Sequence, residues 1–268
     1  MRLNGFQDRS TERDNTMKII ASDYDGTLHH HYSVSPQDRE AIRKWRDHGN
    51  LFGIVTGRAT DMLDTAKDEK LELDFVIVFN GVDVYDVQKD ITQPTLIKRL
   101  AGSTSSMYDM LQIILQAEGN WAEVVTPTRS YFFTHNDTAR EHKHWTAIEN
   151  AKPIKEYIQI YARYENESIS LKIAKELEEK YPSEVSALVN GFWLNAAPPA
   201  ITKASGVWEY AKYMGVKKED IFTIGDSYND LDMLEVFNGY AMANGAEAVK
   251  KAAKGVCVSV AQLVDIAL

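Results

Sequence analysis

The chain has 268 residues, of which 44% are hydrophobic and 26% are charged. This composition is ordinary for a folded globular protein and excludes a disordered or fibrous chain. The formal net charge of -9 repels polyanions, and the apolar runs are too short to span a bilayer. We therefore expect no nucleic-acid partner and no membrane partner. The length allows one large core, or a small domain inserted into a larger one.

Two further features concern the environment and the start of the chain. The single cysteine, Cys257, lies in an apolar stretch and cannot form an internal disulfide, so we expect a buried thiol and a reducing, cytoplasmic compartment. Residues 1–16 are polar and lack the apolar centre of a secretory signal. We expect them to be a leader before Met17, either a non-native addition or a native extension.

Short apolar strands alternate with amphipathic helices from Lys18 onward. The first three strands are expected at 18–22, 51–55 and 75–79. One helix is marked at its start by Ser35-Pro36 and at its end by Gly49, and the next begins near Thr60. Because parallel strands need helical crossovers, this order predicts a parallel sheet covered on both faces.

The alternation stops after Asn80-Gly81 and returns from Lys203. The intervening stretch contains helix-like segments at 107–118 and 168–180 and an alternating segment at 121–133, which indicates a separate α+β unit. The returning pattern is a helix at 206–214, a strand at 221–224, a helix at 231–237, a strand at 240–242, and then a helix, a strand and a helix. We therefore expect an α/β fold with a Rossmann-like core at 17–86 and 195–268, interrupted by an α+β insertion at 87–194.

Two acidic motifs follow strands of the expected sheet. Asp23-Tyr24-Asp25-Gly26-Thr27 comes after the first strand, and Gly225-Asp226-Ser227-Tyr228-Asn229-Asp230 comes after the strand at 221–224. Parallel sheets bind ligands at this edge. An ordinary turn or a helix cap would explain single residues of these motifs but not the whole set. Gathered carboxylates need charge compensation, and an all-oxygen set suits Mg²⁺.

Two other segments contain groups that bind phosphate. Thr56-Gly57-Arg58 ends the second strand, where a hydroxyl and backbone amides at a helix start can hold phosphate oxygens. An ordinary turn is the more frequent explanation of such a pair. Lys203 stands where the core resumes and could neutralise a phosphate, although a lysine at a helix start is usually solvated.

In this order the four segments resemble the motifs of the haloacid dehalogenase (HAD) superfamily. The insertion after the third strand, together with Asn80-Gly81 and the segment 229–234, is similar to the Cof-type branch of sugar-phosphate phosphatases. The resemblance implies a HAD-like core, a cap domain formed by the insertion, a Mg²⁺ cofactor and hydrolysis through an aspartyl-phosphate.

The resemblance also implies a role for each motif residue. Asp23 is expected to be the nucleophile and Asp25 the general acid and base, with Arg58 mainly structural. The expected metal site consists of Asp23, Asp25 through its backbone carbonyl, Asp226 and, in support, Asp230. The residues expected to hold the transferring phosphoryl group are Thr56, Gly57 through its amide, Lys203 and Asn229.

The leading hypothesis is Mg²⁺-dependent hydrolysis of a small phosphorylated metabolite, in particular a sugar phosphate, by a monomer or homodimer. A sugar phosphomutase would use the same nucleophile and is the alternative enzyme. A non-catalytic binding protein is the third hypothesis, and it is disfavoured because each catalytic position is filled.

Other conspicuous residues are not assigned a role. Trp121, Arg129, Tyr131 and His135 could contact a leaving group, but the aromatic ones are better explained as cap core. The run His29-His30-His31 lacks spaced partners for a metal, so a solvated loop is expected.

Overall fold

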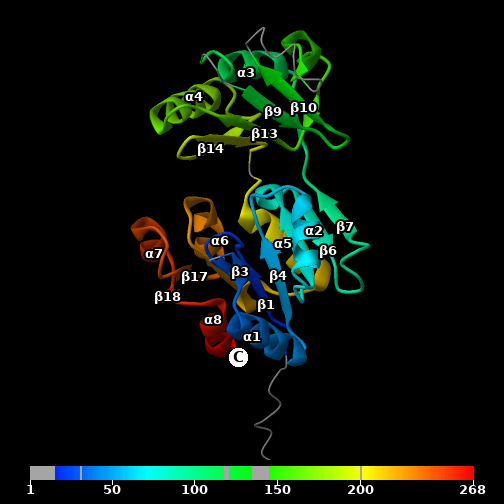
Figure 1. Ribbon diagram of the computed structural model, residues 1–268, viewed down its shortest axis with the longest axis vertical. Helices are drawn as coiled ribbons and strands as arrows, with labels where there is room; N and C mark the ends of the chain where they lie inside the picture. Colours follow the sequence, from blue (N-terminus) through cyan, green and yellow to red (C-terminus); the bar gives the residue numbers. More distant parts are fainter. Residues whose placement is uncertain (1–15, 31, 118–120, 135–144, 200) are drawn as a thin grey trace, which may run out of the picture.

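The fold is described from a computed structural model, which describes residues 16–30, 32–117, 121–134, 145–199 and 201–268. Two units lie one above the other, the larger with blue, cyan and orange-red elements and the smaller in green (Figure 1). Of the expected leader 1–16, only Thr16 belongs to the described residues.

The larger unit is built on an eight-stranded sheet. Its order is β18 (Gly255–Cys257), β17 (Asn238–Met242), β16 (Ile221–Gly225), β1 (Ile19–Ser22), β4 (Leu51–Val55), β5 (Phe75–Val78), β6 (Asp83–Asp86) and β7 (Thr95–Arg99). The strands from β18 to β5 pair in parallel, and β6 and β7 pair antiparallel. The chain builds outward from β1 through β4 to β5, and later from β16 to β18. The order therefore reverses between β1 and β16, which is where open α/β sheets bind ligands.

Helices cover both faces of this sheet because its buried strands are apolar on both sides. Ile20 packs in the cluster that includes α1 (Pro36–Asp47), α2 (Asp61–Asp68) and α8 (Val260–Ala267). Its neighbours Ile19 and Ala21 pack in the cluster of α5 (Lys203–Met214), α6 (Leu231–Val236) and α7 (Glu247–Ala252). Adjacent residues of a strand point to opposite faces, so β1 contributes to both cores.

Helix α1 begins and ends at the residues that the sequence predicted. The Ser35 hydroxyl accepts a hydrogen bond from the Asp38 amide, and Pro36 occupies the first turn, where its missing N–H costs nothing. After the helix, Gly49 adopts a φ of 79°, a left-handed conformation that favours glycine. The strand at 51–55 then follows as expected.

The smaller unit is a six-stranded sheet with helices on one face. Its order is β11 (Trp145–Thr146), β10 (Ser130–Thr134), β9 (Trp121–Val125), β13 (Gln159–Arg163), β15 (Trp193–Ala197) and β14 (Ser186–Asn190). The helices α3 (Met107–Ile114) and α4 (Glu167–Lys180) pack on the sheet in a separate core and lie on its side away from the larger unit (Figure 1). The remaining short elements are β2 (His29–His30), β3 (Ser33–Val34), β8 (Gly102–Ser103), β12 (Glu156–Tyr157), and the 3-10 turns Phe79–Gly81, Ile148–Ala151, Lys218–Asp220 and Tyr228–Asp230.

The two units begin and end at other residues than expected. The insertion was expected at 87–194, but the membership of the two sheets differs from this range. β7 pairs with β6, so residues 95–99 belong to the large sheet rather than to the insertion. β15 runs to Ala197 in the small sheet. The sequence assignment failed here because β6 and β7 form an antiparallel extension, which lacks the strand-helix alternation used to recognise the core.

The histidine run also differs from the expected solvated loop. His29 and His30 form β2, which pairs with β3, and both are half-buried. The His29 ring stacks on the Tyr24 ring at a centroid distance of 4.9 Å. His31 lies outside the described residues. In contrast, the buried position expected for Cys257 is confirmed.

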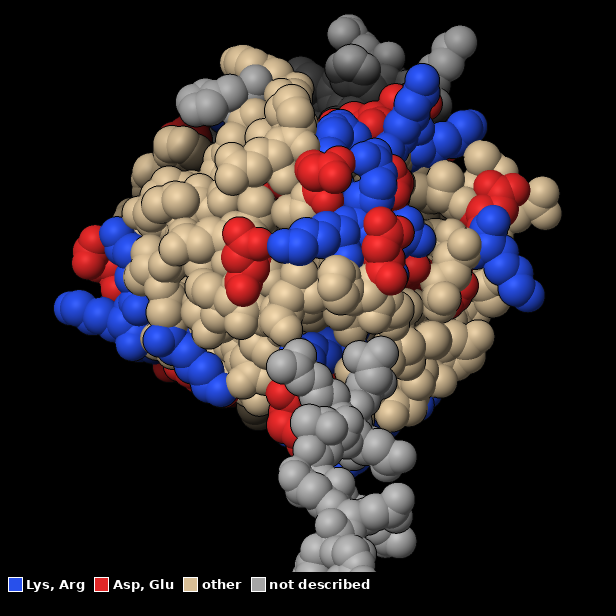
Figure 2. Space-filling view, turned by 90° about the horizontal axis from the view of Figure 1, so that it is seen from below, with Lys and Arg blue, Asp and Glu red and all other residues tan. Residues whose placement is uncertain are grey.

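The surface carries both signs of charge. Seen from the end of the larger unit that lies away from the smaller one, Lys and Arg side chains lie beside Asp and Glu side chains (Figure 2). Ion pairs such as Arg43 with Glu40 at 2.8 Å and Lys44 with Asp265 at 3.3 Å are examples on α1. Within the described part of the chain, no helix has the length and apolar character to cross a membrane.

The turn that follows β5 is tightly fitted against α5. Phe79, Asn80 and Gly81 have φ values of 53°, 54° and 111°. A side chain at Gly81 would overlap the Thr202 carbonyl oxygen, just before α5 begins. Left-handed backbone is costly for a bulky residue such as Phe79, so the surrounding packing must hold this turn in place.

We expect Gly81→Ala to destabilise the protein more than Gly49→Ala. Both positions have positive φ, which costs alanine about 1 kcal/mol, but only Gly81 also meets a neighbour, which adds about 1–3 kcal/mol. Urea denaturation followed by circular dichroism measures the difference. Equal losses in the two variants would contradict the proposed fit between this turn and α5.

Candidate active site

Three carboxylates meet at the carboxyl ends of β1 and β16. Asp23 follows β1 and Asp226 follows β16, on either side of the point where the strand order reverses. Asp23, Asp226 and Asp230 each offer an oxygen within 4.8 Å of the others. Gly26 permits this approach, since a Cβ there would lie 2.6 Å from Asp226 Oδ2 and its φ is 83°. The two acidic motifs therefore form one site, as the sequence predicted.

Lys203 lies between two of these carboxylates. Its Nζ is 2.6 Å from Asp23 Oδ1 and 2.6 Å from Asp230 Oδ1, and the residue is 1% exposed. It is the first residue of α5, which is capped by reciprocal hydrogen bonds between Thr202 and Ser205. The common alternative for such a lysine, a solvated side chain, is contradicted. The helix start places a fixed positive charge inside the acidic cluster.

Asp230 organises the loop that follows β16. Its Oδ1 accepts from Lys203, and its Oδ2 accepts from the backbone amides of Asp226 at 3.0 Å and Ser227 at 2.9 Å. Gly225 makes room for this side chain, because a Cβ there would overlap the Asp230 carboxyl group. Both oxygens are thus engaged by the protein, which suits a residue that positions Lys203 and Asp226.

Burial sets the protonation of this cluster. Burial, opposed by Lys203 and reinforced by the charges of Asp230 and Asp226, raises the pKa of the Asp23 carboxyl to about 8. Burial also raises the pKa of Asp226. For Lys203, burial alone would lower the pKa, but attraction to Asp23 and Asp230 raises it overall, so the ammonium stays charged. The acids outnumber the single buried cation, and additional positive charge would favour their ionised forms.

The expected phosphate-binding residues lie beside the carboxylates. Thr56 is 2% exposed, and its hydroxyl accepts a hydrogen bond from the Arg58 amide at 3.1 Å. Asn229 donates to Asn80 Oδ1 at 3.1 Å, and a Cβ on Gly57 would lie 3.1 Å from that same oxygen. The turn after β5 therefore connects the Thr56-Gly57-Arg58 segment to the loop that follows β16. The sequence identified Asn80-Gly81 only by resemblance. The left-handed backbone of Asn80 explains the position of the Asn80 side-chain amide.

Asp25 forms an ion pair with Arg58, a contact that the sequence did not identify. Arg58 donates from Nε to Asp25 Oδ2 at 2.7 Å and from its terminal nitrogen to Oδ1 at 2.6 Å. The guanidinium also lies over the Tyr24 ring, 4.9 Å from its centroid. Arg58 was expected to be mainly structural, yet it holds the side chain expected to act as acid and base. Both side chains are partly exposed, at 37% for Arg58 and 52% for Asp25.

The smaller unit contacts this site through Tyr161. Its hydroxyl donates to the Gly57 carbonyl at 2.6 Å, and burial raises the pKa of Tyr161 to about 12. The phenol is thus a neutral donor at physiological pH. Nothing in the sequence around β13 distinguished this tyrosine from a core aromatic, because the contact joins residues 104 positions apart.

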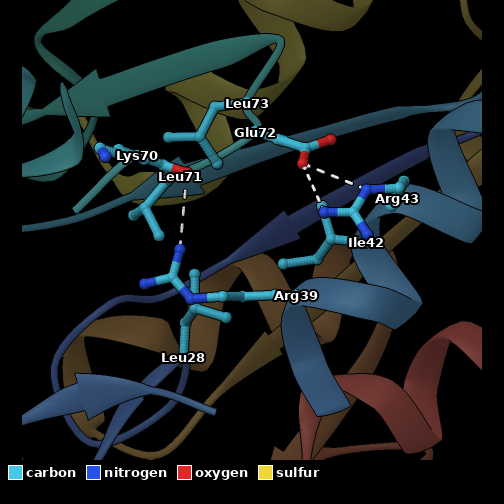
Figure 3. A pocket seen from close by; sticks show the side chains of 8 residues that line it. All are labelled: Leu28, Arg39, Ile42, Arg43, Lys70, Leu71, Glu72 and Leu73. Carbon is cyan, nitrogen blue, oxygen red and sulfur yellow. Dashed lines mark hydrogen bonds and ion pairs between the residues drawn. The ribbon is translucent and has the colours of Figure 1, made fainter. Parts of the chain in front are cut away.

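A hollow of about 60 Å³ lies elsewhere, between α1 and the residues that follow α2 (Figure 3). Its arginines are already engaged. Arg39 donates to the Glu69 carbonyl at 2.9 Å, and Arg43 pairs with Glu72 at 2.9 Å. We assign no ligand to this hollow.

The chain is similar to known phosphatases in sequence and in fold. A family model described as haloacid dehalogenase-like hydrolase matches residues 20–264. The 5-amino-6-(5-phospho-D-ribitylamino)uracil phosphatases YwtE and YcsE of Bacillus subtilis are each 29% identical, over 88% and 91% of this chain and 91% of each relative. A phosphatase of the HAD superfamily from Bacteroides thetaiotaomicron has a similar structure, with a TM-score of 0.74, 23% identity and 96% coverage of both chains. A second solved structure, that of a HAD subclass IIB sugar phosphatase, is similar with a TM-score of 0.73 and 21% identity. The match covers 92% of this chain and 95% of that one. At these identities the structural matches establish the fold alone.

We expect Asp23→Asn to gain stability relative to the unmodified protein as the pH rises from 5 to 8 in EDTA. The carboxyl releases its proton near 3.8 in the unfolded chain but near 8 when folded, so ionisation favours unfolding across this range. The asparagine side chain does not titrate. The difference between the two free energies of unfolding should change by at least about 1 kcal/mol.

Urea titrations at both pH values measure this difference. Asp68→Asn, which removes an exposed carboxylate of α2, is the matched control and should show no such trend. Parallel pH profiles for the Asp23 variant and the unmodified protein would contradict the raised pKa.

Proposed function

Because the chain belongs to the haloacid dehalogenase-like hydrolases, we propose that it is a phosphatase that hydrolyses small phosphate monoesters, sugar phosphates in particular, through a phosphorylated Asp23. Membership of this superfamily, stated first as a resemblance of motifs, is confirmed. The observation that carries the proposal is the buried contact of Lys203 with Asp23 and Asp230 at the edge of the sheet where the strand order reverses. It gives a carboxylate nucleophile beside a fixed positive charge.

In the first half-reaction, a carboxylate oxygen of Asp23 attacks phosphorus in line with the leaving oxygen. The Asp23 O–P bond forms as the P–O bond to the leaving group breaks. Lys203, the Thr56 hydroxyl, the Gly57 amide and Asn229 would bind the equatorial oxygens, where charge must be stabilised. Lys203 contacts Asp23 directly, and the other three residues follow β4 and β16, the strands on either side of β1, which supports this assignment.

Asp25 is proposed to protonate the leaving oxygen and then to accept a proton from the water that hydrolyses the acyl-phosphate. In the present geometry its carboxylate is paired with Arg58. The side chain must therefore turn away from Arg58 before it can act. Both side chains are partly exposed, so water can replace the ion pair when Asp25 turns.

The carboxylates fit a hard divalent ion. Asp23, Asp226 and the backbone carbonyl of Asp25 would hold Mg²⁺, and Asp230 would support them, because the cluster offers only oxygen atoms. When bound, Mg²⁺ supplies positive charge that offsets the repulsion between Asp23 and the phosphate.

The smaller unit is proposed to act as a cap. It contacts the Thr56-Gly57-Arg58 segment through Tyr161. Closure over the site would exclude bulk water from the acyl-phosphate. Relatives named for 5-amino-6-(5-phospho-D-ribitylamino)uracil make phosphorylated polyols and their ring-bearing derivatives suitable members of a substrate panel.

We expect Asp23→Asn to lower phosphate release by at least about a thousandfold, because the nucleophile is lost. The measurement is release of inorganic phosphate from sugar phosphates, nucleotides and p-nitrophenyl phosphate, with Mg²⁺ or with EDTA. Asp68→Asn should keep full activity. Equal release with Mg²⁺ and EDTA would contradict the metal assignment, and undiminished release by the Asp23 variant would contradict the nucleophile.

We expect Asp25→Asn to slow hydrolysis of alkyl phosphates by about 100- to 10,000-fold and that of p-nitrophenyl phosphate much less. An alkoxide needs a proton to leave, whereas p-nitrophenolate is a stable anion. Release of the leaving group in a single turnover, with enzyme in excess, measures the ratio, because loss of the base slows hydrolysis of the common acyl-phosphate equally for both substrates. An equal loss on both would contradict the role of Asp25 as general acid.

A sugar phosphomutase remains the alternative enzyme, since it would use the same nucleophile and return the phosphoryl group to a second hydroxyl. A sugar bisphosphate in the same assay distinguishes the two. Phosphate release without it supports the phosphatase, and transfer that requires it supports the mutase.

A further inference from the structure

The first crossing from the larger unit to the smaller one begins at Arg99, the last residue of β7. Leu100 is still held to the larger unit, since its amide donates to the Val82 carbonyl at 2.8 Å. Gly102 already belongs to β8, which pairs with β12, and Tyr157 of β12 is buried in the core of the smaller unit. The chain therefore passes from one unit to the other within a very short segment at the end of β7 (Figure 1).

The return crossing packs directly against the first. β15 ends at Ala197 and α5 begins at Lys203, so the chain returns to the larger unit between these residues. A Cβ on Gly102 would overlap the Pro198 ring, which shows that the two connections touch at this point. A hinge between two units consists of a few such connecting residues. We call this place, formed by residues 99–102 and 198–202, the junction.

A buried ion pair lies at the junction. Asp83 of β6 is 0% exposed, and Arg99 is its partner on the neighbouring strand. The guanidinium donates to the two carboxylate oxygens, from Nε at 2.7 Å and from Nη2 at 2.6 Å, and the Tyr85 hydroxyl donates to Asp83 at 3.2 Å. A guanidinium bound by two nitrogens has a fixed orientation. Separation of the pair would leave a buried carboxylate without a counter-ion, which is strongly unfavourable.

The same guanidinium also contacts the smaller unit. Nη1 of Arg99 donates to the Pro127 carbonyl at 3.2 Å, in the turn between β9 and β10. Val125, at the end of β9, packs against the core of the larger unit, and Ile158 is buried in that same core. This end of the smaller sheet is therefore attached to the larger unit by a charge-assisted hydrogen bond and by apolar packing.

Tyr161 makes a second contact between the units, at the candidate active site. It lies on β13 two residues beyond Gln159, which is the partner of Val125 in the sheet. The contact of Tyr161 with the Gly57 carbonyl is a single hydrogen bond, whereas the end of the sheet at the junction is held by the fixed guanidinium and by packed side chains. Because one hydrogen bond is the weaker attachment, a rotation of the smaller unit breaks it first.

We propose that Arg99 is a positioning residue that holds the smaller unit at the junction, so that the unit turns about this point and Tyr161 returns to Gly57 after each opening. The described contacts of its guanidinium are with Asp83 and Pro127, so it acts through the smaller sheet and not on the substrate. The inference rests on the proposed phosphatase function and adds to it the contact that places the smaller unit over the site.

Double electron–electron resonance between two spin labels measures how firmly the units are held. The labels are attached to Asp68→Cys of α2 and Leu171→Cys of α4, which are exposed positions, whereas Cys257 is buried. In this labelled protein we expect Arg99→Met to widen the distance distribution at least about twofold, because the attachment at the junction is lost. Arg129→Met removes an exposed arginine of the β9–β10 turn and should leave the distribution unchanged.

A second variant separates positioning from stability. Arg99→Met leaves the Asp83 carboxylate buried and unpaired, which lowers Tm by itself. Asp83→Asn combined with Arg99→Met removes both charges and keeps an acceptor for the Tyr85 hydroxyl. We expect this double variant to have a higher Tm than Arg99→Met and to keep the widened distribution. A distribution as narrow as that of the unmodified protein in the folded double variant overturns the proposal.

Kinetics connect the junction to the reaction. The double variant should raise KM for p-nitrophenyl phosphate about tenfold and keep kcat within about twofold, because only the fraction of molecules with the smaller unit in place binds substrate productively. A widened distribution with an unchanged KM overturns the role of Arg99 in the reaction. Absence of phosphate release from the unmodified protein overturns the proposed function, while the label distances decide independently whether Arg99 holds the junction.

Discussion

The site depends on one buried ionic contact, that of Lys203 with Asp23 and Asp230. An ammonium at 1% exposure remains charged because carboxylates surround it, and it offsets part of the repulsion between them. This mutual requirement fixes α5 against the carboxyl ends of β1 and β16. The same contact brings together residues from both halves of the larger unit, separated along the chain by the whole smaller unit.

The turn after β5 connects α5 to the groups proposed to bind phosphate. Phe79, Asn80 and Gly81 adopt left-handed backbone, and the absence of a side chain at Gly81 allows α5 to begin close by. Asn80 then meets Asn229 on one side and Gly57 on the other. Backbone strain at this turn is compensated by packing on both sides, which is typical of segments that position functional groups.

The smaller unit has its own core and meets the larger unit beside the acidic cluster. Its helices bury the apolar residues on one side of its sheet, and the other side carries polar residues and the exposed Trp193. Tyr161 of β13 donates to the Gly57 carbonyl, so the smaller unit contacts the segment proposed to bind phosphate. The acidic cluster thus belongs wholly to the larger unit, and the smaller unit reaches it through a contact with the Gly57 backbone.

The sequence by itself determined the parallel core, the succession of its strands and helices along the chain, and the acidic motifs that end two of its strands, because strand-helix alternation and short motifs are local signals. Asp23, Asp226 and Lys203 were identified in this way before their contacts were known. Only the tertiary structure decided that β7 extends the large sheet, that Arg58 holds Asp25 and that Tyr161 contacts Gly57. These are pairings between side chains or strands whose partners local patterns do not specify. Each of these contacts joins segments that the fold brings together. Sequence periodicity shows which residues are buried but not which segments meet.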